Sequence, residues 1–140
     1  MVHTLELQNN QIQQVVELIC KTLPTRNIVL LYGDLGVGKT TLVKVICKYL
    51  GIQDNASSPS FGLVNEYGSG ANKLYHIDLY RIRSVEEFWD IGGVELLESN
   101  APCFIEWPEL VQDYIDVHRK IEVYIAYAAD ENKRRYSIYM

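Results

Sequence analysis

The feature that most constrains the fold of this chain is the run Gly33-Asp-Leu-Gly-Val-Gly-Lys-Thr40, which matches the P-loop pattern GxxxxGK[ST] in full. The apolar run 28–32 leads directly into it and predicts a buried strand, and the run 41–50, closed by Gly51, predicts a helix. This context is required, because a strand must deliver a loop whose backbone N–H groups surround phosphates while the next helix points its N-terminus at them. The run therefore predicts a strand, loop and helix that bind a nucleoside triphosphate.

The residue types of the motif have separate tasks. Its glycines permit backbone angles and close approaches that a Cβ would block. Lys39 is expected to reach the β- and γ-phosphates, and the Thr40 hydroxyl is expected to coordinate Mg²⁺. The nucleotide should be held by the loop and the start of its helix, namely Gly33, Asp34, Leu35, Gly36, Val37, Gly38, Lys39, Thr40 and Thr41.

Length, composition and charge limit the class of protein. A chain of 140 residues has the length of one domain, so residues 1–140 are treated as a single unit. The sequence shows no signal peptide and no apolar run of the roughly 18 residues that a membrane span needs, which favours a cytoplasmic protein without membrane contact. With 13 Lys and Arg against 18 Asp and Glu, the net charge of −5 gives no sign of the basic surface that binds nucleic acid tightly.

The three cysteines are an odd number, lie far apart and have apolar neighbours: Cys20, Cys47 and Cys103. This pattern suits buried thiols in a reducing compartment better than disulfides or a zinc site.

Hydrophobic periodicity predicts strands and helices in an α/β order. Val15, Val16 and Ile19 lie on one apolar helical face that Asn9 or Asn10 is expected to cap. Ser84 and Glu87 have the spacing of a capping box at the start of another short helix. A short helix is expected from Pro108 to Tyr114, and the remaining strands are expected at 2–7, 61–67, 73–81, 103–106, 120–128 and 135–139. The predicted fold is a three-layer P-loop NTPase-type α/β domain with a mixed, mainly parallel central sheet and hairpin additions.

Two acids at the ends of apolar strands are candidates for the chemistry beside the P-loop. Phosphoryl transfer needs an acidic group near Mg²⁺ and a group that orients the attacking water or hydroxyl. Asp78 ends the run 74–78, and Glu106 ends the run 103–106. One carboxylate would hold Mg²⁺ through a water while the other polarises the nucleophile, and spacing alone does not assign the roles. Each acid taken alone also fits a solvated strand end.

Four further residues are candidates for a switch or a partner contact. Ser60 lies in the loop after the P-loop helix, where a hydroxyl would join the Mg²⁺ shell or sense the γ-phosphate, although an ordinary turn fits equally well. His76 shares a strand face with Asp78, although a core histidine is the default interpretation. Arg81 would supply positive charge to the transition state, although solvated arginines are common at strand ends. Trp107 follows a candidate catalytic acid, where a packing residue is the default interpretation and a contact with nucleotide or a partner is the alternative.

Five segments together carry a family resemblance: Gly33–Thr41, Ser58–Ser60, Tyr75–Arg81, Glu86–Glu87 and Glu106–Pro108. In order and spacing they resemble the TsaE family, small bacterial ATPases of tRNA threonylcarbamoyladenosine biosynthesis. The resemblance extends from about residue 28 to 110, and its His-x-Asp-Leu-Tyr-Arg and Glu-Trp-Pro motifs are far more specific than the P-loop.

The resemblance implies a function beyond what the spacing predicts. It implies ATP and Mg²⁺ as cofactors, weak ATPase activity in isolation, and TsaD and TsaB as partners. TsaD transfers the threonylcarbamoyl group to adenosine 37 of tRNA, and ATP hydrolysis resets the complex, so this chain would meet tRNA only indirectly. By position, Asp78 is implied to be the Walker B-like acid, Glu106 a second metal-site acid and Trp107 a functional aromatic. Ser60 departs from the threonine that the family usually has.

Two other functions remain open from the residues alone. A small-molecule kinase would need an arginine-rich lid and an acceptor pocket, for which 140 residues leave little room. A nucleotide-sensing module with little turnover is the second alternative. The chain has no Asn-Lys-x-Asp motif for guanine, which favours ATP over GTP.

Overall fold

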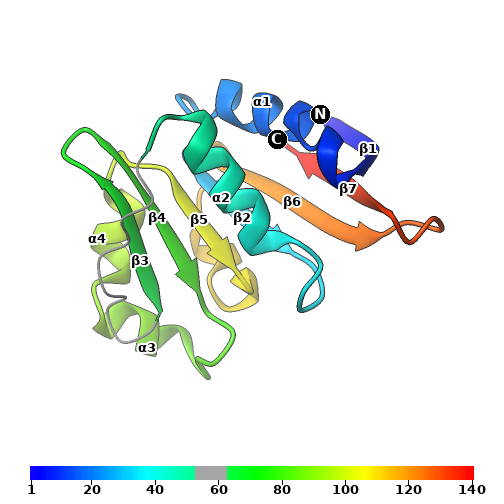
Figure 1. Ribbon diagram of the computed structural model, residues 1–140. Helices are drawn as coiled ribbons and strands as arrows, with labels where there is room; N and C mark the ends of the chain where they lie inside the picture. The colour runs from blue at the N-terminus through cyan, green and yellow to red at the C-terminus, as the bar shows by residue number, and fades with distance from the viewer. Residues whose placement is uncertain (53–62) are drawn as a thin grey trace.

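The computed structural model describes residues 1–52 and 63–140, which form one seven-stranded sheet with helices on both faces (Figure 1). The strand order is β1-β7-β6-β2-β5-β4-β3. The strands are β1 (Val2–Gln8), β2 (Ile28–Tyr32), β3 (Val64–Ser69), β4 (Asn72–Asp78), β5 (Cys103–Glu106), β6 (Lys120–Tyr127) and β7 (Lys133–Tyr139). The helices are α1 (Gln13–Thr22), α2 (Lys39–Tyr49), α3 (Val85–Asp90) and α4 (Gly93–Glu98).

The centre of the sheet is parallel and its margins are antiparallel. β2 pairs in parallel with β5 on one side and β6 on the other, and β4 pairs in parallel with β5. The hairpins β3–β4 and β6–β7 and the pairing of β1 with β7 are antiparallel. Both faces of β2 are covered, which explains why its sequence is a continuous apolar run instead of an alternating one.

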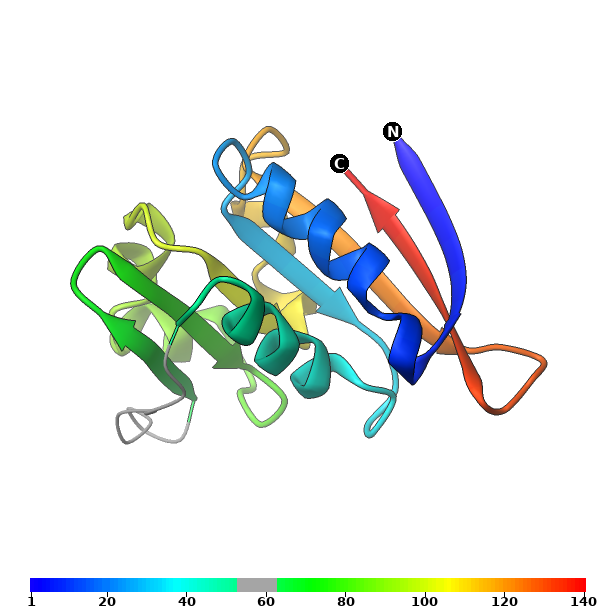
Figure 2. The same ribbon diagram turned by 45° about the horizontal axis from the view of Figure 1, so that its top comes forward.

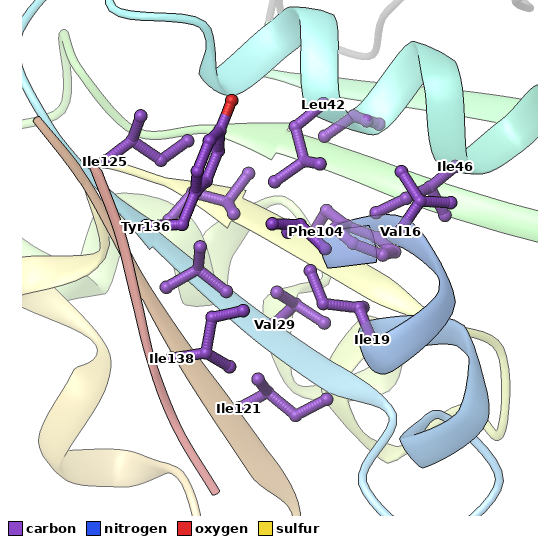
Figure 3. Packing of buried hydrophobic residues seen from close by; sticks show 14 of the residues in the cluster. Val16, Ile19, Val29, Leu42, Ile46, Phe104, Ile121, Ile125, Tyr136 and Ile138 are labelled. Carbon is purple, nitrogen blue, oxygen red and sulfur yellow. The ribbon is translucent and has the colours of Figure 1, made fainter. Parts of the chain in front are cut away.

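The helices form two layers on opposite faces of this sheet. α1 and α2 lie side by side on one face (Figures 1 and 2), where Ile19 and Leu42 pack with sheet residues such as Phe104 (Figure 3). α3 and α4 cover the other face of β2, β5 and β4, where Phe88 is fully buried. The predicted three-layer α/β arrangement with a mixed, mainly parallel sheet is confirmed.

Helix capping differs from the predictions at both predicted caps. Neither Asn9 nor Asn10 is an N-cap, because residues Asn9–Gln11 form a 3₁₀ turn that begins after Gln8. The backbone N–H of Gln8 is instead satisfied by Gln11 Oε1 at 3.0 Å. Ser84 does occupy the N-cap of α3, but its side chain makes no capping bond.

The predicted boundaries of the elements between residues 64 and 114 also differ from those in the structure. The β3–β4 hairpin has a tighter turn than the five-residue connection predicted, since the strands extend to Ser69 and from Asn72. β4 ends at Asp78 and not at residue 81. Two 3₁₀ helices, Pro108–Leu110 and Gln112–Tyr114, replace the single short helix.

Of the helices in residues 1–52 and 63–140, none has the length and apolar character needed to cross a membrane.

Candidate functional site

The P-loop connects the half-buried end of β2 to the N-terminus of α2 and leaves an open cradle. Gly36 and Gly38 have φ of +80° and +124°, and a Cβ on either would meet no atom within 4 Å. Gly38 is the N-cap of α2, and no side-chain hydrogen bond caps this helix. The first turn of α2 contains no acidic residue. The backbone N–H groups of this turn therefore lack side-chain partners and favour an anion.

Lys39 brings a buried cation to this cradle. Its residue is only 4% exposed, and Nζ donates a hydrogen bond to the carbonyl oxygen of Gly33 at 2.5 Å. Nζ also lies 3.7 Å from the ring centroid of Trp107. Burial lowers the pKa of the Lys39 ammonium below its usual value, and the nearby charges of Glu106 and Asp78 only partly oppose this shift. A bound polyanion would relieve that desolvation penalty.

Glu106 is the centre of a short hydrogen-bonded chain. Its Oε2 accepts a hydrogen bond from the Thr40 hydroxyl at 2.7 Å and lies 2.5 Å from His76 Nε2. Burial alone would raise the pKa of the Glu106 carboxyl, but the bonds from His76 and Thr40 outweigh burial and hold the pKa below its usual value. Glu106 is therefore an ionised, nearly buried carboxylate in direct contact with the hydroxyl expected to coordinate Mg²⁺.

His76 is both a core residue and a neighbour of the site. It is 5% exposed, and its Nδ1 has no hydrogen-bond partner among the described residues. The bond from Nε2 to Glu106 puts His76 next to the site, and its low exposure puts it in the core, so both interpretations of this residue describe its position.

The two predicted acids meet because β4 and β5 are parallel neighbours. Asp78 is paired with Glu106 in the strand register, which places both side chains on the face covered by α2. Asp78 is exposed, and its Oδ1 accepts a hydrogen bond from the backbone N–H of Tyr80 at 3.0 Å. Both acids line a cavity of about 190 Å³ with Leu35, Gly36, Gly38, Lys39, Thr40, Thr41 and Trp107.

Trp107 has an unusual backbone conformation. At φ 55° and ψ 57° it is left-handed, and among the described residues it is the one non-glycine with positive φ. The conformation costs roughly 1–2 kcal/mol, and the following Pro108 restricts it further. It places the indole over Lys39 and 5.0 Å, between ring centroids, from Tyr80. Strain of this kind is typical of functional sites.

The other predicted residues lie at the margins of the site or outside the described chain. Arg81 is exposed and lines a neighbouring cavity of about 490 Å³ with Leu35, Leu63, Asp78 and Tyr80. Asp34 is exposed, whereas the Val37 side chain is 2% exposed and packs into the core. Ser60 and the loop around it fall within residues 53–62, which are not described.

A pair on the β6–β7 hairpin was missed by the sequence analysis. Arg134 Nε donates to the carbonyl oxygen of Val37 at 3.1 Å, and the Tyr127 hydroxyl donates to that of Gly36 at 3.5 Å. The Arg134 guanidinium lies 4.2 Å from the centroid of the Tyr127 ring. The two residues are register partners in the hairpin, so pairing the closing strands across their turn would have brought them together. The predicted strand began one residue too late, at 135, to include Arg134.

A metal ion at this site would need ligands other than a cluster of acidic side chains. Among the residues the structure describes, no group of three or more His, Cys, Asp or Glu side chains could hold a metal. The Thr40 hydroxyl, Asp78 and Glu106 nevertheless surround one cavity. This sparse oxygen set fits Mg²⁺, which usually keeps several waters and binds through one or two carboxylates and substrate phosphates.

The glycine-rich loop between a buried parallel strand and a helix, in a sheet with helices on both faces, defines an α/β protein of the P-loop type. Residues 7–136 match the family model described as threonylcarbamoyl adenosine biosynthesis protein TsaE. The chain belongs to the TsaE family, and the predicted resemblance is confirmed.

Individual relatives agree with this assignment. The tRNA threonylcarbamoyladenosine biosynthesis protein TsaE of Rickettsia conorii is 38% identical over 138 residues, covering 98% of this chain and 77% of the relative. Its namesake from Bacillus subtilis is 35% identical over 107 residues, covering 76% and 66%. The crystal structure of Bacillus subtilis YdiB matches with a TM-score of 0.67 and 26% identity, covering 99% of this chain and 86% of that one. The family model and the two TsaE relatives place the chain in a family of tRNA threonylcarbamoyladenosine biosynthesis, and the solved structure agrees with the fold.

Proposed function

We propose that this chain is a Mg²⁺-dependent ATPase with weak intrinsic activity that serves tRNA threonylcarbamoyladenosine modification together with TsaB and TsaD. The observation that carries the proposal is the meeting of Lys39, Thr40 and Glu106 in one cavity at the start of α2. A buried cation, an uncapped helix N-terminus and an ionised carboxylate are the groups that phosphoryl transfer uses.

The residues present fit a polyphosphate and Mg²⁺. The open space over Gly36 and Gly38 leaves room for phosphate oxygens, and Lys39 supplies the charge that faces them. Thr40 would hold Mg²⁺ through its hydroxyl, with Asp78 and Glu106 beside it. When bound, the ion would neutralise charge on the phosphates.

The chain's own side chains would exchange partners when the nucleotide enters. Lys39 now bonds to the Gly33 carbonyl, and the Thr40 hydroxyl now bonds to Glu106. Turning Lys39 to phosphate would release the Gly33 carbonyl oxygen. Turning Thr40 to the metal would remove one of the two hydrogen bonds at Glu106 Oε2, and that acceptor position would then orient water while the bond to His76 remains. His76 would keep Glu106 in place during this exchange, since its bond to Oε2 does not involve the ligand.

The small number of cationic side chains near the cavity supports the proposed dependence on partners. Lys39 is the one cationic side chain lining the cavity in the described part of the chain, and Arg81 lies exposed beside it. A partner would then complete the charge around the transition state, which accounts for weak activity alone. The net charge of −5 agrees with contact to tRNA through that partner, in the cytoplasm, instead of directly.

The test is Mg-ATP turnover by the full chain, alone and with the matching TsaB–TsaD pair. A low rate that rises with the pair supports the proposal. Lys39→Ala should abolish turnover and ATP binding, Glu106→Ala should retain much of the binding but lose turnover, and Lys44→Ala, an exposed lysine of the same helix, should change neither.

Three results would contradict the proposal. Normal turnover by Glu106→Ala in the complex would remove its catalytic role. A Lys39→Ala variant that hydrolyses ATP like the wild type would remove the site itself. A rate that ignores TsaB–TsaD but rises with a metabolite would point to a small-molecule kinase.

A further inference from the structure

We propose that a groove beside α4, on the face of the sheet that α3 and α4 cover, binds a protein segment that carries apolar anchor residues among lysines or arginines (Figure 1). The groove lies at the opposite end of β2 from the P-loop, because it is lined by Ile28, the first residue of that strand. It is a second binding surface, so the proposal goes beyond the proposed function and does not depend on it.

The groove has the size and the lining of a site for apolar side chains. Its volume is about 380 Å³, which falls within the roughly 300–1,000 Å³ of ligand pockets. The buried residues Ile28, Leu97 and Ile115 line it from the core. Val94 and Tyr114 line it at the surface, where they are 44% and 62% exposed. A partner with apolar side chains would remove this exposed surface from water.

Two aromatic rings line the groove and contact each other. Trp89 of α3 and Tyr114 lie edge to face, with ring centroids 5.4 Å apart and an interplanar angle of 82°. Tryptophan and tyrosine are the residue types most often found at the centre of protein interfaces, because their large rings bury much area at little cost in conformational entropy. The pair therefore suits an anchor contact for a partner.

The surface around the groove is strongly acidic. Residues 84–118 contain nine of the 18 Asp and Glu residues of the chain and none of its 13 Lys and Arg residues. Glu106 belongs to the nucleotide cavity. The other eight are exposed: Glu86, Glu87, Asp90, Glu95, Glu98, Glu109, Asp113 and Asp116. Such a surface attracts lysine and arginine and repels nucleic acid and anionic lipid.

The carboxylates that line the groove are available to a partner. They are Glu98 and Asp116, and neither forms an ion pair with a described residue. In the described part of the chain, Arg119 is the one lysine or arginine that lines the groove. Its Nη2 already donates to the carbonyl oxygen of Leu97 at 2.7 Å and to Asn27 Oδ1 at 3.2 Å. The acidic charge of the groove therefore exceeds its own cationic charge and complements a basic segment.

Side chains must carry the recognition of this segment. The groove lies over β2, which is central in the strand order, so it offers no free sheet edge for an added strand. An amphipathic helix that lays its apolar face in a groove is recognised through side chains alone. Its apolar residues would contact Val94 and Tyr114, and its cationic residues would meet Glu98 and Asp116.

The test uses the full chain and three labelled peptides of equal length. The first is a helical peptide of leucine and lysine, with leucines at positions i, i+3, i+4 and i+7. The second has glutamate in place of lysine, and the third has alanine in place of leucine. Fluorescence anisotropy gives the dissociation constants. Only the leucine–lysine peptide should bind, and added salt should weaken its binding.

Two variants at the groove have matched controls on the opposite face of the sheet. Glu98→Lys reverses a charge at the C-terminal end of α4, where a cation suits the helix dipole, and should weaken the leucine–lysine peptide about 2- to 30-fold. Tyr114→Ser should weaken it about 5- to 30-fold. Glu17→Lys on α1 and Tyr49→Ser on α2 change exposed residues of the same types and should leave the affinity unchanged.

The two tryptophans of the chain show where the peptide binds. Trp89 lines the groove, and Trp107 lines the nucleotide cavity. Their indole N–H signals in NMR spectra can be assigned with Trp89→Phe and Trp107→Phe. The leucine–lysine peptide should shift the Trp89 signal and leave the Trp107 signal in place. A failure of Mg-ATP to bind would refute the proposed function and leave this result standing.

Each other outcome overturns one specific step. The absence of binding by the leucine–lysine peptide would refute the site. Equal affinity for the lysine and glutamate peptides would remove the charge argument, and equal affinity for the leucine and alanine peptides would remove the apolar one. Equal losses in Glu98→Lys and Glu17→Lys, or a shift of the Trp107 signal alone, would place the peptide elsewhere. A dimer in sedimentation that Tyr114→Ser abolishes would assign the groove to a second copy of this chain.

Discussion

The bond between His76 and Glu106 can be measured as a coupling energy. Replacing His76 with Leu removes a hydrogen bond to an ionised, buried carboxylate, which is worth about 1.5–3 kcal/mol. The same change also removes Nδ1, a buried polar atom without a partner among the described residues, whose desolvation costs about 1–3 kcal/mol. Because the two effects oppose each other, His76→Leu alone should change the free energy of unfolding by less than about 2 kcal/mol.

A double-mutant cycle separates these contributions. Glu106→Met removes the carboxylate at similar length, and the double variant removes both partners. Loss of the unpaired Nδ1 raises the free energy of unfolding equally with and without the Glu106 carboxylate. This contribution therefore cancels from the coupling energy. The remaining coupling should be about 1.5–3 kcal/mol. In urea, with a slope of about 2 kcal/mol per molar, this corresponds to roughly 1 M of non-additivity in the midpoints.

The exposed ion pair between Glu6 and Arg135 is the control for this cycle. Their side chains are 48% and 47% exposed, so their coupling should fall at about 0.2–1 kcal/mol. A His76–Glu106 coupling of about 0.5 kcal/mol or less, no larger than the control, would show that the bond contributes no more than a surface pair. The proposed orienting role of His76 would then lose its basis.

Two further predictions concern the same site. Because its folded-state pKa is lowered, ionised Glu106 contributes stability that is fully present above the usual glutamate pKa of about 4.3 and is lost as the pH falls through the lower folded-state pKa. Wild type should therefore lose more stability than Glu106→Gln as urea unfolding is repeated from pH 5 to pH 3, and parallel pH profiles would contradict this. Gly33→Ala should lower the melting temperature more than Gly36→Ala does. A Cβ on Gly33 would lie 2.6 Å from a carbonyl oxygen of β6. A Cβ on Gly36 would have open space, and only the φ of +80° would be unfavourable. Equal melting temperatures would contradict the close approach.

The sequence predicts those parts of the molecule whose signals are local. The P-loop is a contiguous motif, and β5 was predicted with its observed bounds because a short apolar run ending in an acid is a complete signal for a buried strand. The capping box at Ser84 failed although its spacing is correct. The Glu87 carboxylate accepts from the backbone N–H of Arg83 at 3.4 Å, one residue before the expected partner. Spacing identifies such a cap, but side-chain rotamers decide whether it forms.

The contacts that define the site depend instead on strand order and register, which the sequence does not contain locally. His76 lies opposite Phe104 and Asp78 opposite Glu106, and this register puts His76 within a hydrogen bond of Glu106. A slip of one residue would turn the β4 side chains to the face covered by α3 and α4. Predicting the bond therefore requires knowing that β4 lies beside β5, although α3 and α4 separate them in the chain.

The P-loop motif alone does not determine which residues contact the loop. Thr40 meets Glu106 on one flank of the loop, and the carbonyls of Gly36 and Val37 meet Tyr127 and Arg134 on the other. None of these partners lies within the motif, and each comes from a strand placed by the fold of the whole chain. The motif therefore predicts the loop itself, whereas the contact with an acid on one side and with an aromatic–arginine pair on the other follows only from the order of the strands.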